Sequence, residues 1–542
     1  MTSTERIFLR LERRGYPMDI VGITVLAPHD EGPLPFRVLY GRMNDATRLS
    51  PHLTRRLSRA PLGIGEDHWI EAEDFDLDEH VHHIECPAPG DTRALLDLVL
   101  EITDEPLNRS RPLWVAWYVS GMAGGRTALL FRAHHALTDG LGFMKLYDHV
   151  FDADDQGTPP AHQEASSVPL GEALGAYIGP ENPQVGEHEP PALLRAAYEV
   201  PERMAHTVVT SSRIARTLVG GVPSAVGGVA ARVARTVGDA IAMAGAEPEP
   251  EPESERELEP EPPEVSGAPG STPREDSRGG AGRRGAHRRL TLPRFIPSPT
   301  DHPPVTRFQA HITDTTKCLS VASVPMAEIE TARTCCPGAT VNDVILAMAT
   351  GALRSYLSAH DELPDEPLLT TCPVSVRKDG HSEGNAFTTI WVELPVHVED
   401  PLERLRAVHA SANRSKAGVR ASLRSWDVLA DVGDLLLPGM VSAVMAFAGS
   451  KVFTRFPPTL NLSVSTMRSA TTPYYLGRRR VEHMYARTIV CPPVHLFVHA
   501  ITYAGSAELG VLSLREVLPD PDALAAGLRA ELDLLLRLAP ES

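Results

Sequence analysis

Residues Phe131–Phe143 read FRAHHALTDGLGF, and this stretch contains a histidine pair between a predicted strand and a predicted helix. The apolar run Thr127–Ala133 has the composition of a buried strand, and Gly142–Val150 has the apolar spacing of a helix. The sequence therefore predicts a strand, a turn with two adjacent histidines, and a helix. Because adjacent residues that leave a strand point to opposite sides, we expect one histidine to face the core and the other a cavity.

A histidine in this position is suited to general-base catalysis, because its ordinary pKa of about 6.5 lets a neutral imidazole accept a proton near neutral pH. Such a base activates a hydroxyl without a serine or cysteine nucleophile. Asp139 can cap the following helix or hold an arginine, and Gly140 lets the backbone pass close to another segment. Three alternatives stay open: a metal site on the histidine pair and Asp139, the H-x4-D pattern of glycerol-phosphate acyltransferases, and satisfied core histidines.

The composition is that of a globular chain. Its 542 residues correspond to two to four domains at roughly 100–200 residues each, with 42% apolar and 23% charged residues. Asp and Glu total 70 against 52 Lys and Arg, and this net charge of −18 argues against a general nucleic-acid binder. The spacing of the cysteines fits neither a zinc site nor a disulfide framework, so free thiols are expected. We also expect that the protein holds no metal and no cofactor. The cysteines are Cys86, Cys318, Cys335, Cys336, Cys372 and Cys491.

The ends and the apolar runs bear on the location of the protein. The first residues, MTSTERIFLRLERRG, lack the apolar core of a signal peptide. No run of about 18 apolar residues predicts a membrane span. The sequence therefore predicts a cytoplasmic protein.

A linker divides the chain. Residues 247–264 read EPEPEPESERELEPEPPE, in which proline and like charges prevent a helix or a sheet, and a Gly- and Arg-rich run follows. The sequence thus predicts sub-domains at 1–190 and 301–542, an amphipathic helical segment at 191–246, and a disordered linker at 247–300. The Arg-bearing helical segment either lies on a membrane surface or packs on the protein.

Both halves mix strands and helices, which predicts an α/β class with mixed, α+β-like sheets. In the first half the expected strands are Ile23–Ala27, Leu113–Ser120 and Thr127–Ala133, with a further helix at Ala94–Leu107. In the second half Val341–Leu357 has the apolar stripe of a helix that Thr340 or Asn342 can cap. Strands are expected there at Leu368–Val376, Ala386–Val396, Thr459–Ser465 and Val494–Gly505.

The segment His134–Gly140 matches the HHxxxDG motif of the CoA-dependent acyltransferase superfamily, and the chain resembles the bacterial wax ester synthase/diacylglycerol acyltransferase family. The segments that carry the resemblance occur in the family's order in both halves. They are STERIFLRLE, Pro17–Gly22, Asp74–Gly90, Pro106–Trp114 with its Pro112–Leu113–Trp114 (PLW), the helix with Asn342–Asp343 (ND), Pro373–Arg377, Gly384–Phe387 and Ile501–Gly505.

The resemblance implies two chloramphenicol-acetyltransferase-like sub-domains with an active-site tunnel between them. It implies that His135 is the general base, while His134 and Asp139 hold the loop and Gly140 keeps the tunnel open. It implies acyl-CoA as a substrate and a lipid alcohol as acceptor, with acyl transfer in a ternary complex. Pro112, Leu113 and Trp114 shape the active-site strand or serve packing alone.

Further residues in the second half are weaker candidates. Asn342 and Asp343 face the tunnel or cap their helix, and Ser465 is a candidate oxyanion donor. The apolar residues Leu435–Phe447 line an acyl channel, contact lipid or pack in the core. The family's usual SNVPGP reads here Ser465–Ala470, STMRSA, and Asn108 replaces the usual aspartate before PLW.

The function expected from the resemblance is triacylglycerol or wax ester synthesis: transfer of a long-chain acyl group from acyl-CoA to diacylglycerol or a fatty alcohol. The departures in the second half keep two alternatives open. One is the same chemistry with a polyketide, glycolipid or carrier-bound acceptor, and the other is a non-catalytic lipid-binding protein. Peripheral association with the inner membrane face or with lipid droplets is also expected.

Overall fold

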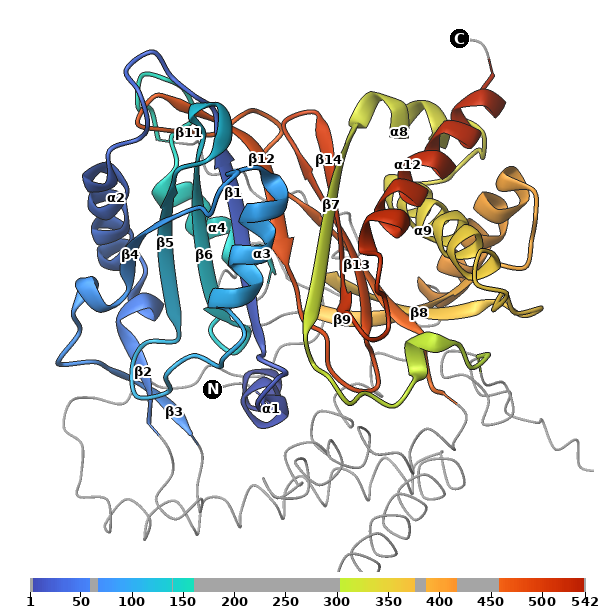
Figure 1. The fold of residues 1–542 in the computed structure, drawn as a ribbon, viewed down its shortest axis with the longest axis horizontal. Helices are drawn as coiled ribbons and strands as arrows, with labels where there is room; N and C mark the ends of the chain where they lie inside the picture. The colour runs from blue at the N-terminus through green and yellow to red at the C-terminus, as the bar shows by residue number, and fades with distance from the viewer. Residues whose placement is uncertain are drawn as a thin grey trace, which may run out of the picture. The chain divides into compact units, whose positions relative to one another are not determined.

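The computed structural model describes residues 3–58, 67–138, 140–159, 303–375, 387–416 and 458–540 (Figure 1). All of them belong to one compact unit, made of residues 1–212 and 293–542. A second unit, residues 213–292, lies outside the described residues, as do the predicted segments 191–246 and 247–300. The same holds for Asp139 and for Leu435–Phe447.

Two six-stranded mixed sheets form the framework, and they confirm the predicted α/β class with mixed sheets (Figure 1). The first sheet has the order β11-β12-β1-β6-β5-β4, in which only β4 and β5 are parallel. Its strands are β1 (Asp19–Leu26), β4 (Val81–Glu85), β5 (Trp114–Ser120), β6 (Thr127–His134), β11 (Tyr475–Leu476) and β12 (Arg479–Arg487).

The second sheet has the order β7-β14-β13-β10-β8-β9, with β10 parallel to both of its neighbours. Its strands are β7 (Lys317–Pro325), β8 (Leu368–Ser375), β9 (Phe387–Leu394), β10 (Leu462–Arg468), β13 (Leu496–Tyr503) and β14 (Ser506–Leu514). A separate hairpin joins β2 (Arg55–Ser58) to β3 (His68–Glu71).

The second half of the chain completes the first sheet. β12 pairs antiparallel with β1, so that Arg487 lies opposite Val21, and β1 in turn pairs with β6. The sheet that carries the histidine pair is therefore built from both halves.

Helices cover the sheets, and their apolar residues fill two main cores. The helices are α1 (Ser3–Leu11), α2 (Phe36–Leu49), α3 (Thr92–Ile102), α4 (Gly140–Val150), α8 (Met326–Arg333), α9 (Val341–Ser358) and α12 (Pro521–Leu538), with a further helical run at 401–416. α2 and α4 pack on the first sheet, where Gly22 of β1 is required because a Cβ there would lie 2.2 Å from the Tyr147 hydroxyl. α9 and α12 pack on each other beside the second sheet (Figure 1).

Two sequence predictions about helices have different outcomes. Thr340 caps α9 in a capping box with Asp343, as one of the two expected caps. The predicted helix at Ala94–Leu107 is too long, because α3 ends at Ile102. The carbonyls of Thr103 and Glu105 accept hydrogen bonds from arginines of β12 and β6 instead, and Pro106 disfavours a helical conformation at Glu105.

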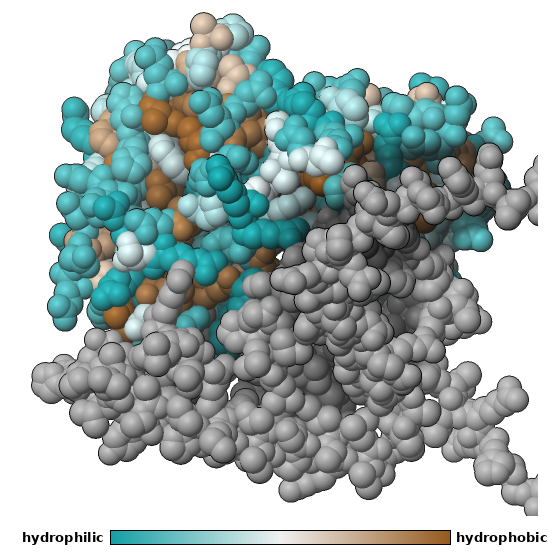
Figure 2. Space-filling view, turned by 60° about the horizontal axis from the view of Figure 1, so that its bottom comes forward, coloured by the Kyte–Doolittle hydropathy of each residue, from teal (hydrophilic) through white to brown (hydrophobic). Residues whose placement is uncertain are grey.

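The face in Figure 2 is mostly hydrophilic, with scattered hydrophobic patches. The large apolar side chains that are most exposed among the described residues are Ile7, Leu49, Val305, Leu534 and Leu538. Within the part of the chain that the structure describes, none of the helices has the length and apolar character needed to cross a membrane.

Candidate active site

The histidine pair lies where β6 ends. His134 is the last residue of β6, one residue later than the sequence predicts, and His135 begins the turn that leads to α4. The His134 N–H donates to the Leu113 carbonyl at 2.9 Å, and the His135 N–H donates to the Met18 carbonyl at 2.8 Å. The backbone of the pair is thus fixed by the residues that precede β5 and β1.

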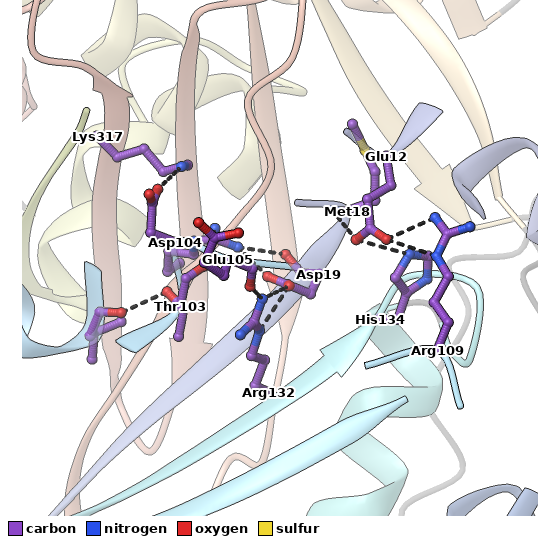
Figure 3. Close-up of polar contacts among 12 residues, drawn as sticks. Glu12, Met18, Asp19, Thr103, Asp104, Glu105, Arg109, Arg132, His134 and Lys317 are labelled. Atoms are coloured by element: carbon purple, nitrogen blue, oxygen red, sulfur yellow. Dashed lines mark hydrogen bonds and ion pairs between the residues drawn. The ribbon is translucent and has the colours of Figure 1, made fainter. Parts of the chain in front are cut away.

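The two histidines differ in exposure, in agreement with the alternation expected at a strand end. His134 has an exposed fraction of 0%, whereas His135 is partly exposed. The Ala136 N–H donates to His134 Nδ1 at 3.0 Å, so the ring proton of His134 lies on Nε2. Nε2 faces the Glu12 carboxylate at 3.4 Å (Figure 3).

Glu12 joins three segments around this histidine. Its carboxylate accepts from Arg109 Nη2 at 2.8 Å and from the Met18 N–H at 3.2 Å, beside the contact with His134 (Figure 3). Burial would raise the pKa of Glu12, but the hydrogen bonds from His134 and Arg109, together with the charge of Arg109, outweigh it and lower that pKa to about 2. Glu12 is therefore an ionised carboxylate that contacts the buried histidine, His134.

His135 is contacted by an aromatic ring of α1. The Phe8 ring stacks on the imidazole with centroids 4.0 Å apart and planes 11° apart. The Glu12 N–H donates to the Phe8 carbonyl at 3.2 Å, so Glu12, the residue after α1, lies one helical turn beyond Phe8 on the same side. The last turn of α1 and the residue that follows it therefore contact both histidines.

The Pro112–Leu113–Trp114 segment makes contacts within the protein interior. Leu113 and Trp114 are fully buried, and the Trp114 indole N–H donates to the Leu53 carbonyl at 2.7 Å. The Trp114 ring stacks with Phe131 of β6, and Pro112 forms a bridge with Arg56. These residues hold β5 against β6 and, through the Leu113 carbonyl, fix the position of His134.

A buried ionic cluster lies beside the pair. Asp19, which is opposite His134 in the register of β1 and β6, accepts from Arg132 Nη2 at 2.5 Å and from Arg487 of β12 (Figure 3). Lys317 of β7 extends the cluster with an ion pair to Asp104 at 2.7 Å. Burial lowers the pKa of both Arg487 and Lys317 against the effect of their carboxylate partners. The cluster connects both halves of the chain to the strand that carries the histidines.

The structure also describes the contacts of the candidates in the second half. The Thr466 hydroxyl donates to Asn342 Oδ1 at 2.8 Å, which brings Asn342 to the strand that contains Ser465. Ser465 lies beside His499 in the register of β10 and β13. Asp343 is fully buried, caps α9 and contacts His409 Nδ1 at 2.8 Å. Asp343 therefore takes part in the capping box of α9 and also contacts a histidine of the helical run at 401–416.

The remaining motif residues are placed only in part. Gly140 begins α4, two residues earlier than the sequence predicts, and Asp139 lies outside the described residues. Across the described ranges, no three or more His, Cys, Asp or Glu side chains are grouped in a way that could hold a metal ion.

Sequence reasoning missed the roles of Phe8, Glu12 and Arg109. Phe8 and Glu12 lie in the quoted opening STERIFLRLE, and Arg109 lies three residues before Pro112. Their contacts join residues that are 97 to more than 120 positions apart, so helix periodicity carries no signal for them. The sequence shows only that an acid follows a short amphipathic stretch, and this pattern does not reveal that the acid is buried.

Replacing Glu12 by glutamine should lower both stability and activity, because the neutral amide weakens the charge-assisted contacts with Arg109 and His134. We expect a loss of about 1–3 kcal/mol at pH 7. Since the folded-state pKa is about 2 against an ordinary 4.5, the stabilisation is complete above pH 4.5 and is lost as the pH falls towards 2. Urea unfolding of both proteins at several pH values measures this. An energy difference between them that stays constant from pH 7 to pH 3 would contradict the assignment.

Two family models match the chain. One describes the wax ester synthase/diacylglycerol acyltransferase catalytic domain and matches residues 1–295, and the other describes the corresponding C-terminal domain and matches residues 383–536.

Relatives and a solved structure match over almost the full length. A probable diacylglycerol O-acyltransferase of Mycobacterium tuberculosis is 26% identical over 540 residues, which are 98% of this chain and 97% of the relative. The O-acyltransferase WSD of Acinetobacter baylyi is 25% identical over 97% of this chain and 95% of its own. A wax ester synthase/diacylglycerol acyltransferase from Marinobacter aquaeolei is similar in fold, with a TM-score of 0.60, 20% identity, and coverage of 99% of this chain and 98% of that one.

Proposed function

This chain belongs to the wax ester synthase/diacylglycerol acyltransferase family, and we propose that it transfers a long-chain fatty acyl group from acyl-CoA to a lipid alcohol. The acceptor is the free hydroxyl of diacylglycerol, which yields triacylglycerol, or of a fatty alcohol, which yields a wax ester. The observation that carries the proposal is the pair of histidines at the end of β6, one buried against Glu12 and one partly exposed.

In the proposed reaction the His135 imidazole accepts the proton of the acceptor hydroxyl while that oxygen attacks the thioester carbonyl. The tetrahedral intermediate then collapses, the ester forms, and the CoA thiolate takes the proton back from His135. His134 does not share this role, because its Nδ1 accepts from the backbone and its Nε2 faces Glu12. It positions the turn instead.

The cysteines support direct transfer over a cysteinyl acyl-enzyme. A thiolate is the reactive form of cysteine, and burial disfavours it. Burial raises the pKa of Cys318 and Cys491 to about 11 and that of Cys372 to about 12, and it also raises the pKa values of the remaining thiols. A base that activates the acceptor hydroxyl directly needs none of them.

The proposal includes contact with a lipid surface. Diacylglycerol and long-chain alcohols partition into lipid, so the enzyme meets them at a membrane or droplet surface. A peripheral mode of binding, without a spanning helix, is sufficient for this access.

We expect CoA release that depends on an alcohol. Palmitoyl-CoA and a thiol reagent report the release, with diacylglycerol or hexadecanol in phosphatidylcholine vesicles, and vesicles alone as the control. At least a tenfold stimulation by one of the alcohols is expected, since hydrolysis by water is the competing reaction. Flotation of the same vesicles measures association with the lipid surface.

The outcomes of this assay separate the acceptor classes. Release with hexadecanol but not diacylglycerol identifies a wax ester synthase, and the reverse identifies a diacylglycerol acyltransferase. Equal release with and without either alcohol would contradict the proposal, and the altered segment Ser465–Ala470 makes an unrelated acceptor the first alternative to test.

A further inference from the structure

The stack between Phe8 and His135 has a geometry that bears on the chemical step. The ring centroids are 4.0 Å apart and the planes differ by 11°, so the Phe8 face covers one face of the imidazole. Phe8 is itself partly buried and packs against the core that contains Leu113 and Ala136. Its ring is therefore a fixed surface, and the imidazole plane is fixed with it.

A phenyl ring carries a negative face that attracts a cation within about 6 Å of its centroid. The imidazole of a general base is neutral before the reaction and becomes positive as it takes the hydroxyl proton. The attraction between Phe8 and His135 is therefore stronger in the transition state than in the ground state. An interaction of this kind raises kcat and leaves substrate binding almost unchanged.

We propose that Phe8 is a positioning residue for the acyl transfer, which holds the His135 ring in its reactive plane and stabilises the imidazolium that forms. The inference rests on the proposed general-base role of His135. It assigns a chemical contribution to α1, while Glu12, the residue that follows this helix, contacts His134. Phe8 therefore contacts His135 and Glu12 contacts His134, both from the C-terminal end of α1.

Two substitutions at position 8 test the inference. Phe8→Leu keeps an apolar side chain in the core but removes the aromatic face, and Phe8→Tyr keeps the face. We expect Phe8→Leu to lower kcat by about five- to thirtyfold with KM for both substrates changed by less than about twofold. Phe8→Tyr should stay within about threefold of the wild type. Ile7→Ala, at an exposed neighbouring position on α1, is the matched control and should be unchanged.

Thermal unfolding of each variant separates this effect from a loss of fold. The inference is overturned if Phe8→Leu keeps the wild-type kcat, if its loss lies in KM alone, or if Phe8→Tyr is as impaired as Phe8→Leu. His135→Ala is assayed in parallel. If that variant is fully active, the general-base proposal fails; if it is inactive while Phe8→Leu is fully active, only the role of Phe8 fails.

Discussion

Replacing His135 by alanine is expected to lower the rate of acyl transfer by about 10²–10⁴-fold, the range that general-base catalysis supplies. The fold should remain, because His135 is partly exposed in a turn whose backbone is held by the Met18 carbonyl. The loss should be the same for every alcohol that the enzyme accepts, since the proton is taken from the hydroxyl that all of them share. It should appear in kcat, with KM for palmitoyl-CoA nearly unchanged.

The measurement is CoA release by wild type and variant, with thermal unfolding of both. His397→Ala is the matched control, because His397 is exposed and its contact with Arg354 is made by its backbone carbonyl, which the substitution keeps. A His135→Ala protein with the wild-type kcat would rule out His135 as the base. A variant that is inactive and also unfolded would contradict the exposure argument, and His135→Gln would then replace alanine in the assay.

A comparison with His134 sharpens this prediction. His134 is fully buried, and its removal leaves the Glu12 carboxylate with one partner fewer. A variant at His134 therefore loses stability as well as activity, whereas His135→Ala loses activity alone. Measuring both the activity and the free energy of unfolding of each variant therefore distinguishes the roles of the two histidines.

Much of the framework could be predicted from local sequence. β6 and α9 have apolar patterns that are strong enough to specify their type, and Thr340 lies where a helix cap is required. The histidine pair at the end of β6 follows from the same pattern. These features depend on residues that are neighbours in the chain.

The features that sequence did not predict depend on partners far along the chain. α3 ends at Ile102 because the next carbonyls are used by Arg132 and Arg487. β12 reads RRVEHMYAR, and its charges do not resemble those of a strand inside a sheet, yet Arg487 is 1% exposed. Its burial is tolerated because Asp19 of β1 is its partner.

This partnership leads to the second large effect, that of replacing Asp19 by alanine. Asp19 is fully buried and is shared by Arg132 and Arg487, so its removal leaves two guanidinium groups in the interior without their carboxylate. Breaking a buried pair in this way typically costs about 3–5 kcal/mol. Guanidinium chloride unfolding at pH 7 should show a shift of that size in the free energy of unfolding.

A surface pair gives the matched control for Asp19. Arg414 and Glu393 form an ion pair at 2.7 Å with both side chains more than half exposed, and Glu393→Ala should cost less than about 1 kcal/mol. Similar losses for the two alanine variants would contradict the account of the buried cluster. Arg487→Met should lie between them, because Asp19 keeps its two contacts with Arg132.

The position of Asp19 connects this stability effect to the chemistry. It is paired with His134 in the register of β1 and β6, and it follows Met18, whose carbonyl holds the His135 N–H. Arg487 reaches Asp19 from the second half, so that half supports the turn on which the proposed base lies. Asp19→Ala should therefore also lower kcat under conditions in which the variant is fully folded. If the folded variant keeps the wild-type kcat, the cluster stabilises the two halves without positioning the histidines.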